Sequence, residues 1–165
     1  ELRSKPLAVR SDLVLEPWML EYARDAAKSA FRGQEFTVTV SSQESEFHPK
    51  GDLFDGLQGS SWWAKPEDEE PWIRIESTKG VHLKELWLSP AASNELWLKD
   101  CAVFDEVELR INDAKVPLTV KMESDWRLKT KVALGKSMLV RKLELRVRHT
   151  PEPDKYVGFA EIEGR

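Results

Sequence analysis

From residue 36 onward, apolar residues recur at every second position, and this period of two constrains the fold more than any other feature of the sequence. Successive side chains of a β-strand point to opposite faces, so such a segment has one buried and one solvated face. In the first example, Phe36, Val38 and Val40 alternate with hydroxyl side chains. The alternation therefore predicts strands that each have one wet face.

Eight or nine segments of this kind follow one another, separated by turn-rich clusters such as Asn112-Asp113-Ala114. They show no alternation with helical patterns, so a parallel sheet is not expected. The pattern predicts an all-β antiparallel sandwich or barrel. The expected strands cover residues 36–40, 73–75, 81–89, 96–98, 103–111, 116–122, 126–132, 143–147 and 156–162.

Two of these segments carry local irregularities. The apolar phase of segment 81–89 changes between Leu83 and Leu86, which predicts a β-bulge or burial on both faces. Pro117 has no N–H to donate, so segment 116–122 is expected at a sheet edge or in an irregular pairing.

The N-terminal part of the chain has a different period. Met19, Tyr22 and Ala26 are spaced three or four residues apart, Pro17 suits the first helical position, and Gly33 can adopt the left-handed stop. We therefore expect one short helix over residues 17–31. We therefore divide the chain into two parts. Residues 1–34 form an extended N-terminal segment and helix that pack on the domain or lead into it, and residues 35–165 form a β-sandwich.

Composition narrows the class of protein. With 165 residues, 41% hydrophobic and 33% charged, the chain can bury the core of one globular domain, and it has no apolar run long enough to span a bilayer. Its formal charge is -4, so no global attraction to nucleic acid is expected. Eight Lys or Arg residues lie between Arg127 and Arg148, but they take the polar phase of alternating strands, which favours a solvated sheet face over a nucleic-acid surface.

The sequence lacks the common catalytic templates. It has no phosphate-binding glycine loop, no Gly-x-Ser-x-Gly elbow, no His-Glu-x-x-His and no Cys-x-x-Cys pair. The lone Cys101 precedes Ala102, Val103 and Phe104, which favours a buried structural thiol. We therefore expect a protein that is not an enzyme.

Two adjacent tryptophans are the strongest candidates for ligand contact. Trp62 and Trp63 follow a turn-rich segment, and adjacent residues of an extended chain point in opposite directions, so we expect one buried indole and one exposed. An exposed indole stacks well on sugar CH groups or on an apolar partner surface. Together with Lys65, Glu67 and Asp68 in the following loop, they form the predicted ligand-binding set, although an acidic run between prolines is also typical of a solvated loop.

Several segments, in order, resemble a known family. These are Leu53-Phe54-Asp55-Gly56, then Ser60-x-Trp62, then Pro71-Trp72-Ile73-Arg74-Ile75, with a further strand at 81–90 and a last strand at 156–164 that contains Glu161. This arrangement resembles the discoidin or coagulation-factor C-type family of the galactose-binding-like group. The resemblance covers roughly residues 36–164.

The resemblance implies a jelly-roll β-sandwich, generally non-catalytic, that binds glycans, lipid headgroups or proteins through loops at one end. We expect a carbohydrate-binding module of a longer polypeptide that is secreted, periplasmic or on the cell surface. The family's paired cysteines are missing, which points to a bacterial or intracellular type of relative. The alternative is a structural domain that docks to another domain or subunit and has no small ligand.

The resemblance also implies a metal position. Many bacterial members hold a structural calcium near the Asp-Gly turn, and Asp55 and Glu161 match two of its ligands. Leu57 stands where the family has a second acid, which removes an oxygen ligand. From the residues alone, Asp55 is expected to cap its own turn while Gly56 takes a positive φ.

Overall fold

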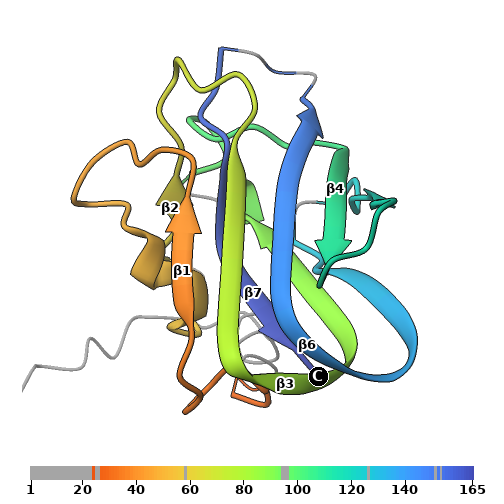
Figure 1. The fold of residues 1–165 in the computed structure, drawn as a ribbon. Helices are drawn as coiled ribbons and strands as arrows, with labels where there is room; N and C mark the ends of the chain where they lie inside the picture. The colour runs from red at the N-terminus through yellow and green to blue at the C-terminus, as the bar shows by residue number, and fades with distance from the viewer. Residues whose placement is uncertain are drawn as a thin grey trace, which may run out of the picture.

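The computed structural model describes residue 24 and residues 27–57, 59–93, 97–125, 127–150, 152 and 154–165. Over these residues the chain is mostly antiparallel β-structure (Figure 1). The strands are β1 (Thr37–Val40), β2 (Trp62–Trp63), β3 (Trp72–Pro90), β4 (Glu106–Ile111), β5 (Leu118–Lys121), β6 (Thr130–His149) and β7 (Gly158–Gly164). Two 3-10 helices, η1 (Lys50–Phe54) and η2 (Ala91–Ser93), lie in the connections.

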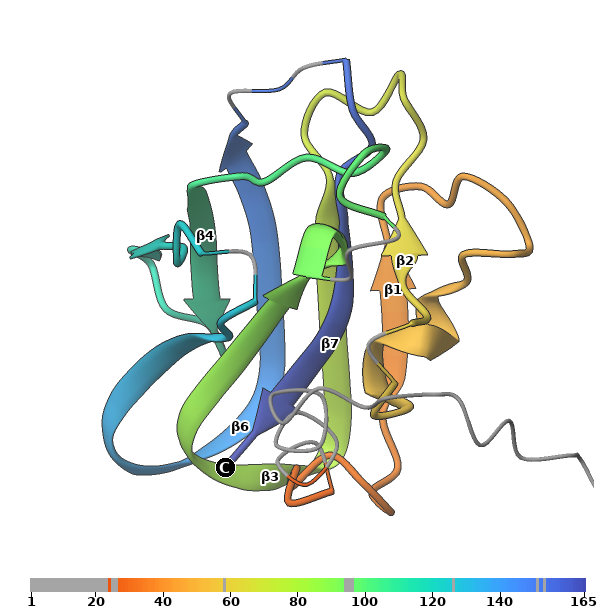
Figure 2. The same cartoon turned by 180° about the vertical axis from the view of Figure 1, so that it is seen from behind.

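The strands form two layers that share their longest members. The hydrogen-bonded order is β2-β7-β3-β6-β4-β5, and β1 pairs with β3. Strands β3 and β6 pair with each other along nearly their whole length and curve together (Figures 1 and 2). One layer therefore contains β1, the first half of β3, the second half of β6, β4 and β5, and the other contains the remaining halves with β7 and β2.

Two pairs of expected strands are continuous in the structure. Segments 73–75 and 81–89 join in β3, and β6 spans the end of segment 126–132 and all of 143–147. Gly80 and Gly135 have φ of 77° and 81°, a left-handed conformation that lets these long strands kink where the sequence suggested a break. The β3–β6 register shifts between Leu83 and Glu85, which confirms the predicted bulge.

Other boundaries differ from the predictions. The strand predicted at 96–98 is wrong, because residues 97–100 form turns in which the N–H groups of Asp100 and Cys101 both donate to the carbonyl of Trp97. Leu96 and Trp126 lie outside the described residues. Strand β5 ends the order and pairs with β4, so the edge position predicted from Pro117 is confirmed.

The core lies between the two layers. It is built from the apolar phases of the long strands, and its largest fully buried aliphatic side chains are Leu53, Ile73, Leu83, Leu86, Leu88, Leu109, Leu143, Leu145 and Ile162. Full burial of one such side chain stabilises the fold by about 1.5–3 kcal/mol. The solvated phase of β6 carries cations that pair with carboxylates of neighbouring segments, for example Arg146 with Glu70 at 2.8 Å.

The segment before β1 packs on the sandwich. Most of the predicted helix lies outside the described residues, and its described end, residues 27–31, is not helical. Gly33 has φ of 72°, the left-handed conformation expected of it. Phe31 is buried and packs edge-on against Phe36 and Phe54, and the N–H of Ala30 donates to the carbonyl of Gly164. The domain division at residue 34 stays a prediction.

Over the part of the chain that the structure describes, no helix has the length and apolar character that crossing a bilayer requires.

Gly158 tests how tightly β7 packs against β2. A Cβ at this position would lie 2.2 Å from the carbonyl oxygen of Trp62, so the backbones would have to separate. We expect Gly158→Ala to lower the free energy of unfolding by about 1–3 kcal/mol in urea denaturation. Gly51→Ala is the matched control, because nothing lies within 4 Å of its added Cβ, and its effect should be within about 0.5 kcal/mol. Equal effects would contradict this packing.

Candidate functional site

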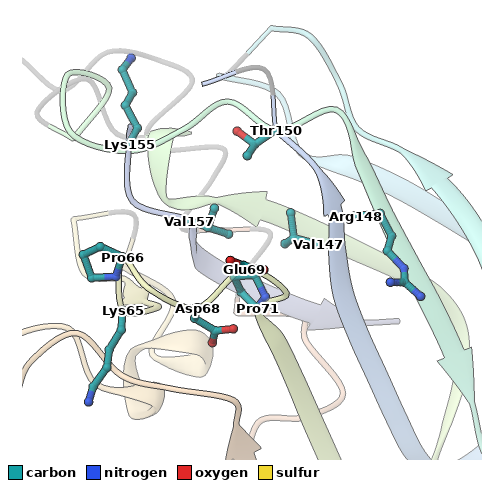
Figure 3. Close-up of a pocket in the computed structure, with 10 residues that line it drawn as sticks. All are labelled: Lys65, Pro66, Asp68, Glu69, Pro71, Val147, Arg148, Thr150, Lys155 and Val157. Carbon is teal, nitrogen blue, oxygen red and sulfur yellow. The ribbon is translucent and has the colours of Figure 1, made fainter. Parts of the chain in front are cut away.

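A pocket of about 270 Å³ opens at one end of the sandwich. Three segments enclose it: the loop between β2 and β3, the end of β6, and the chain that leads into β7, which meet at the top of Figure 1. Figure 3 shows the ten lining residues. Loops at the end of a β-sandwich can vary without disturbing its core, so this is a suitable place for recognition.

Backbone hydrogen bonds hold the three segments together. The N–H of Val147 donates to the carbonyl of Pro71 at 2.9 Å, and the N–H of Ala64 donates to the carbonyl of Val157 at 2.8 Å. Val147 belongs to the buried core, and Val157 packs against it. The apolar part of the pocket is therefore an extension of the core and is held as firmly as the strands.

Asp68 fixes the β2–β3 loop to the end of β1. One of its carboxylate oxygens accepts hydrogen bonds from the hydroxyls of Ser41 and Ser42 at 2.5 and 2.6 Å. The same two hydroxyl oxygens accept the backbone N–H groups of Trp72 and Lys65. Asp68 is therefore held in one position at the pocket by neutral donors, and among the described residues no cation pairs with its carboxylate.

The other polar groups of the pocket differ in how they are paired. Arg148 donates to the carboxylates of Glu108 and Glu70 at 2.8 and 3.0 Å, and the hydrogen bond to Glu108 raises the pKa of the guanidinium. Lys155 pairs with Glu152 at 2.6 Å. Among the described residues, the side chain of Glu69 has no ion-pair or hydrogen-bond partner.

The predicted ligand-binding residues divide into two groups. Lys65 and Asp68 line the pocket, and Glu67 lies in the same loop, exposed but outside the lining. Trp62 and Trp63 do not line it, and with exposed fractions of 0% and 5% both are buried. The prediction that one of the two indoles is exposed is wrong.

The burial of Trp63 has a clear physical cause. The two indoles do belong to opposite faces, since Trp62 packs in the main core and Trp63 in a second cluster. That second face is also covered: His48 stacks on Trp63 with ring centroids 3.6 Å apart, and Tyr156 stacks at 5.0 Å. The indole N–H of Trp63 donates to the hydroxyl of Ser61. Trp63 is therefore a packing residue.

The sequence analysis did not predict the side of the pocket that the end of β6 and the chain before β7 form. Val147, Thr150, Lys155 and Val157 come from segments about 80 residues beyond the β2–β3 loop. Their residue types are ordinary for strand ends, and they reach the loop because β6 pairs with β3 and β7 pairs with β2 and β3. No signal in the sequence marks them.

The Asp-Gly turn has the predicted geometry. One carboxylate oxygen of Asp55 accepts the N–H of Leu57 at 2.8 Å, and Gly56 has φ of 79°. Glu161, which is 1% exposed, accepts the N–H of Gly56 at 2.8 Å, so the turn and the last strand do meet. Burial raises the pKa of Glu161 to about 8, and the charge of Asp55 adds to this.

The residues at this turn do not fit a calcium ion. Calcium takes about six to eight oxygen ligands, and the part of the chain that the structure describes brings no three His, Cys, Asp or Glu side chains together as a metal site. The side chain of Leu57 offers no oxygen. The carbonyl of Asp55 accepts the guanidinium of Arg32 at 2.9 Å, so positive charge already lies at the turn, and the second carboxylate oxygen of Asp55 accepts the hydroxyl of Ser60 at 2.6 Å.

The side chain of Cys101 has the properties of an unreactive thiol. It is fully buried, and burial raises the pKa of its thiol to about 12, so the thiolate is scarce at neutral pH. The predicted structural thiol is confirmed.

Comparisons with known proteins place the fold. No family model matches the sequence, and no curated protein matches it. Among solved structures, a family 32 carbohydrate-binding module from Clostridium perfringens NanJ in complex with galactose matches with a TM-score of 0.61 and 14% identity, over 78% of this chain and 92% of that one. The chain has the galactose-binding-like β-sandwich fold, as the sequence predicted.

Two further structures illustrate the range of this fold. Chitosan-binding module 1, from a chitosanase/glucanase of Paenibacillus sp. IK-5, matches with a TM-score of 0.60 and 16% identity, over 80% of this chain and 96% of that one. A Ruminococcus gnavus GH29 fucosidase in complex with fucose matches with a TM-score of 0.62 and 14% identity, over 84% of this chain but 26% of that one. The matched part is nearly the whole of the solved chain in the two modules and about a quarter of the fucosidase chain.

Calcium removal tests the reading of the Asp-Gly turn. We expect replacing calcium chloride with EDTA to leave the melting temperature unchanged within about 1 °C, because a ligand stabilises only a state that binds it. Arg32→Ala should lower the free energy of unfolding by about 1 kcal/mol, since it removes the hydrogen bond to the carbonyl of Asp55. A calcium-dependent rise in the melting temperature of the unaltered protein would contradict the reading.

Glu161 also predicts a pH dependence. Its pKa is about 8 when folded, against an ordinary value of 4.5, so the folded protein binds more protons than the unfolded chain between these values. The free energy of unfolding contributed by this group therefore falls as pH rises from about 4.5 to 8. Glu161→Gln should gain stability relative to the unaltered protein across this range, measured by urea denaturation at several pH values. If the difference in free energy of unfolding between Glu161→Gln and the unaltered protein does not change with pH, the raised pKa of Glu161 is contradicted.

Proposed function

We propose that the chain is a non-catalytic carbohydrate-binding module of the discoidin type, and that the pocket at the end of the sandwich is its glycan site. The observation that carries the proposal is the pocket itself, in which an apolar floor anchored in the core adjoins carboxylate, hydroxyl and cationic side chains. The fold is shared by modules whose described ligands are galactose and chitosan, which supports the same class of ligand here.

The chemistry of the pocket suits a sugar. A sugar ring has apolar CH groups on its faces and hydroxyls at its edge, and the pocket offers Val147, Val157 and Pro71 beside Asp68 and Thr150. Its volume of about 270 Å³ lies just below the roughly 300–1,000 Å³ of pockets for drug-sized ligands, which favours one or two sugar units. An apolar floor and a few fixed polar groups give both affinity and orientation.

The positions and pKa values of the carboxyl groups favour a binding site over a catalytic site. A glycosidase needs two facing carboxyls, one of them with a raised pKa. Among the described residues, the carboxyl whose pKa rises most is that of Glu161, and it is buried at the Asp-Gly turn rather than in the pocket.

We further propose that the chain is a segment of a longer polypeptide that is secreted, periplasmic or at the cell surface. The fucosidase in which a matching part covers 26% of the chain supports the first part of this proposal.

The alternative function, docking to another domain or subunit, has one observation in its favour. Val116 is 78% exposed just before the edge strand β5, and Leu118, the first residue of that strand, is 52% exposed. Exposed apolar residues at a free strand edge are typical of association surfaces. Size-exclusion chromatography that shows association of the protein, lost in Leu118→Lys, would support docking over glycan binding.

Filling the pocket tests the glycan proposal. A glycan array should reveal at least one bound glycan, and Thr150→Trp should weaken its binding at least about tenfold in calorimetry, because an indole would occupy the cavity. Thr78→Trp is the matched control, since Thr78 lines a separate hollow at Asn112 and Arg141 and should leave binding unchanged. Equal thermal unfolding of both variants would exclude misfolding. No bound glycan on the array, or equal loss in both variants, would contradict the proposal.

A further inference from the structure

The charges around the pocket are unevenly paired. The β2–β3 loop contains the run Glu67-Asp68-Glu69-Glu70, and of these Glu70 forms ion pairs, with Arg146 and Arg148. Asp68 is held by neutral hydroxyls, and within the described residues Glu67 and Glu69 have no cationic partner. Three negative charges of this loop are therefore uncompensated by direct pairing.

The cations of the pocket do not offset these charges inside it. The guanidinium of Arg148 donates to Glu108 and Glu70, and the ammonium of Lys155 donates to Glu152 and to the carbonyl of Leu98. Lys65 extends away from the apolar floor in Figure 3, and Lys155 extends away on the opposite side. An anionic ligand would therefore meet two cations that are already paired with carboxylates, while Lys65, whose ammonium has no partner among the described residues, extends away from the apolar floor.

Glu69 is the carboxylate best placed to meet a ligand. It lines the pocket together with Pro71, Val147 and Val157, which form the apolar floor. Glu69 is exposed, so its carboxylate is accessible to a bound cation. A ligand that rests on the floor would place its polar edge at Glu69.

We propose, on the basis of the glycan site proposed above, that this pocket selects sugars with a protonated amine, such as a deacetylated hexosamine unit, and that Glu69 binds the ammonium. A hydrogen bond between charged partners is roughly twice as strong as one between neutral groups. The same site disfavours acidic sugars, because their carboxylate would face Glu69 and Asp68, and the nearby Arg148 and Lys155 are already paired with carboxylates.

The test compares two probes that differ in the amine alone. Calorimetric titration with a glucosamine trimer and with an N-acetylglucosamine trimer at about pH 6, where the amine is protonated, should give at least about tenfold tighter binding of the glucosamine trimer. The preference should shrink at about pH 9, where the amine is neutral, and at high salt, because screening weakens an exposed ion pair.

Two variants test whether the preference for the glucosamine trimer comes from Glu69. Glu69→Gln keeps the shape of the side chain and removes its charge, so the preference for the glucosamine trimer should fall to near unity. Glu76→Gln is the matched control, because Glu76 is an exposed glutamate that lines the separate hollow near Asn112, and the preference should stay. Equal affinity for both trimers, or a preference that survives in Glu69→Gln, would overturn the inference.

The design separates this inference from the function on which it rests. If a neutral or acidic glycan binds the pocket and is blocked by Thr150→Trp while the glucosamine trimer does not bind, the module is a glycan binder and the amine selectivity is wrong. If no glycan of any kind binds, both fail.

Discussion

The structure depends on the antiparallel pairing of β3 and β6. These two strands run side by side through both layers, and β1, β4 and β7 each pair directly with one of them. The register shift at Leu83 allows apolar residues on both sides of the bend to face the same core. Backbone pairing therefore joins the two layers, and with Cys101 as its one cysteine the chain has no internal disulfide.

The same pairing positions the pocket. Strand β6 delivers Val147 and Arg148 to the end of the sandwich, where β3 begins just after the acidic loop. The serines at the end of β1 then hold that loop through Asp68. The proposed glycan site is thus built from strand ends and one loop held by hydrogen bonds. Side chains on such a frame lose little freedom when a ligand binds, which lowers the entropic cost of binding.

Sequence reasoning succeeded where the determinant is local. The phase change between Leu83 and Leu86 revealed the bulge, Pro117 marked the edge, and the Asp55-Gly56 pair gave the turn. It failed where burial depends on remote segments. The rule that neighbours point to opposite faces holds for Trp62 and Trp63, yet His48 and Tyr156 cover the second face, and their approach has no local signal. For the same reason the sequence predicted one wall of the pocket and missed the other.

The carbonyl of Arg165 accepts the backbone N–H groups of Lys84 and Glu85 at the bend of β3, and the N–H of Arg165 donates back to Glu85. This end of the chain lies at the opposite extremity of the sandwich from the β2–β3 loop (Figure 1). Coupling the protein to a sensor chip or bead through a peptide added after Arg165 would therefore turn the proposed glycan site outward, which is the orientation that multivalent capture of a polysaccharide requires.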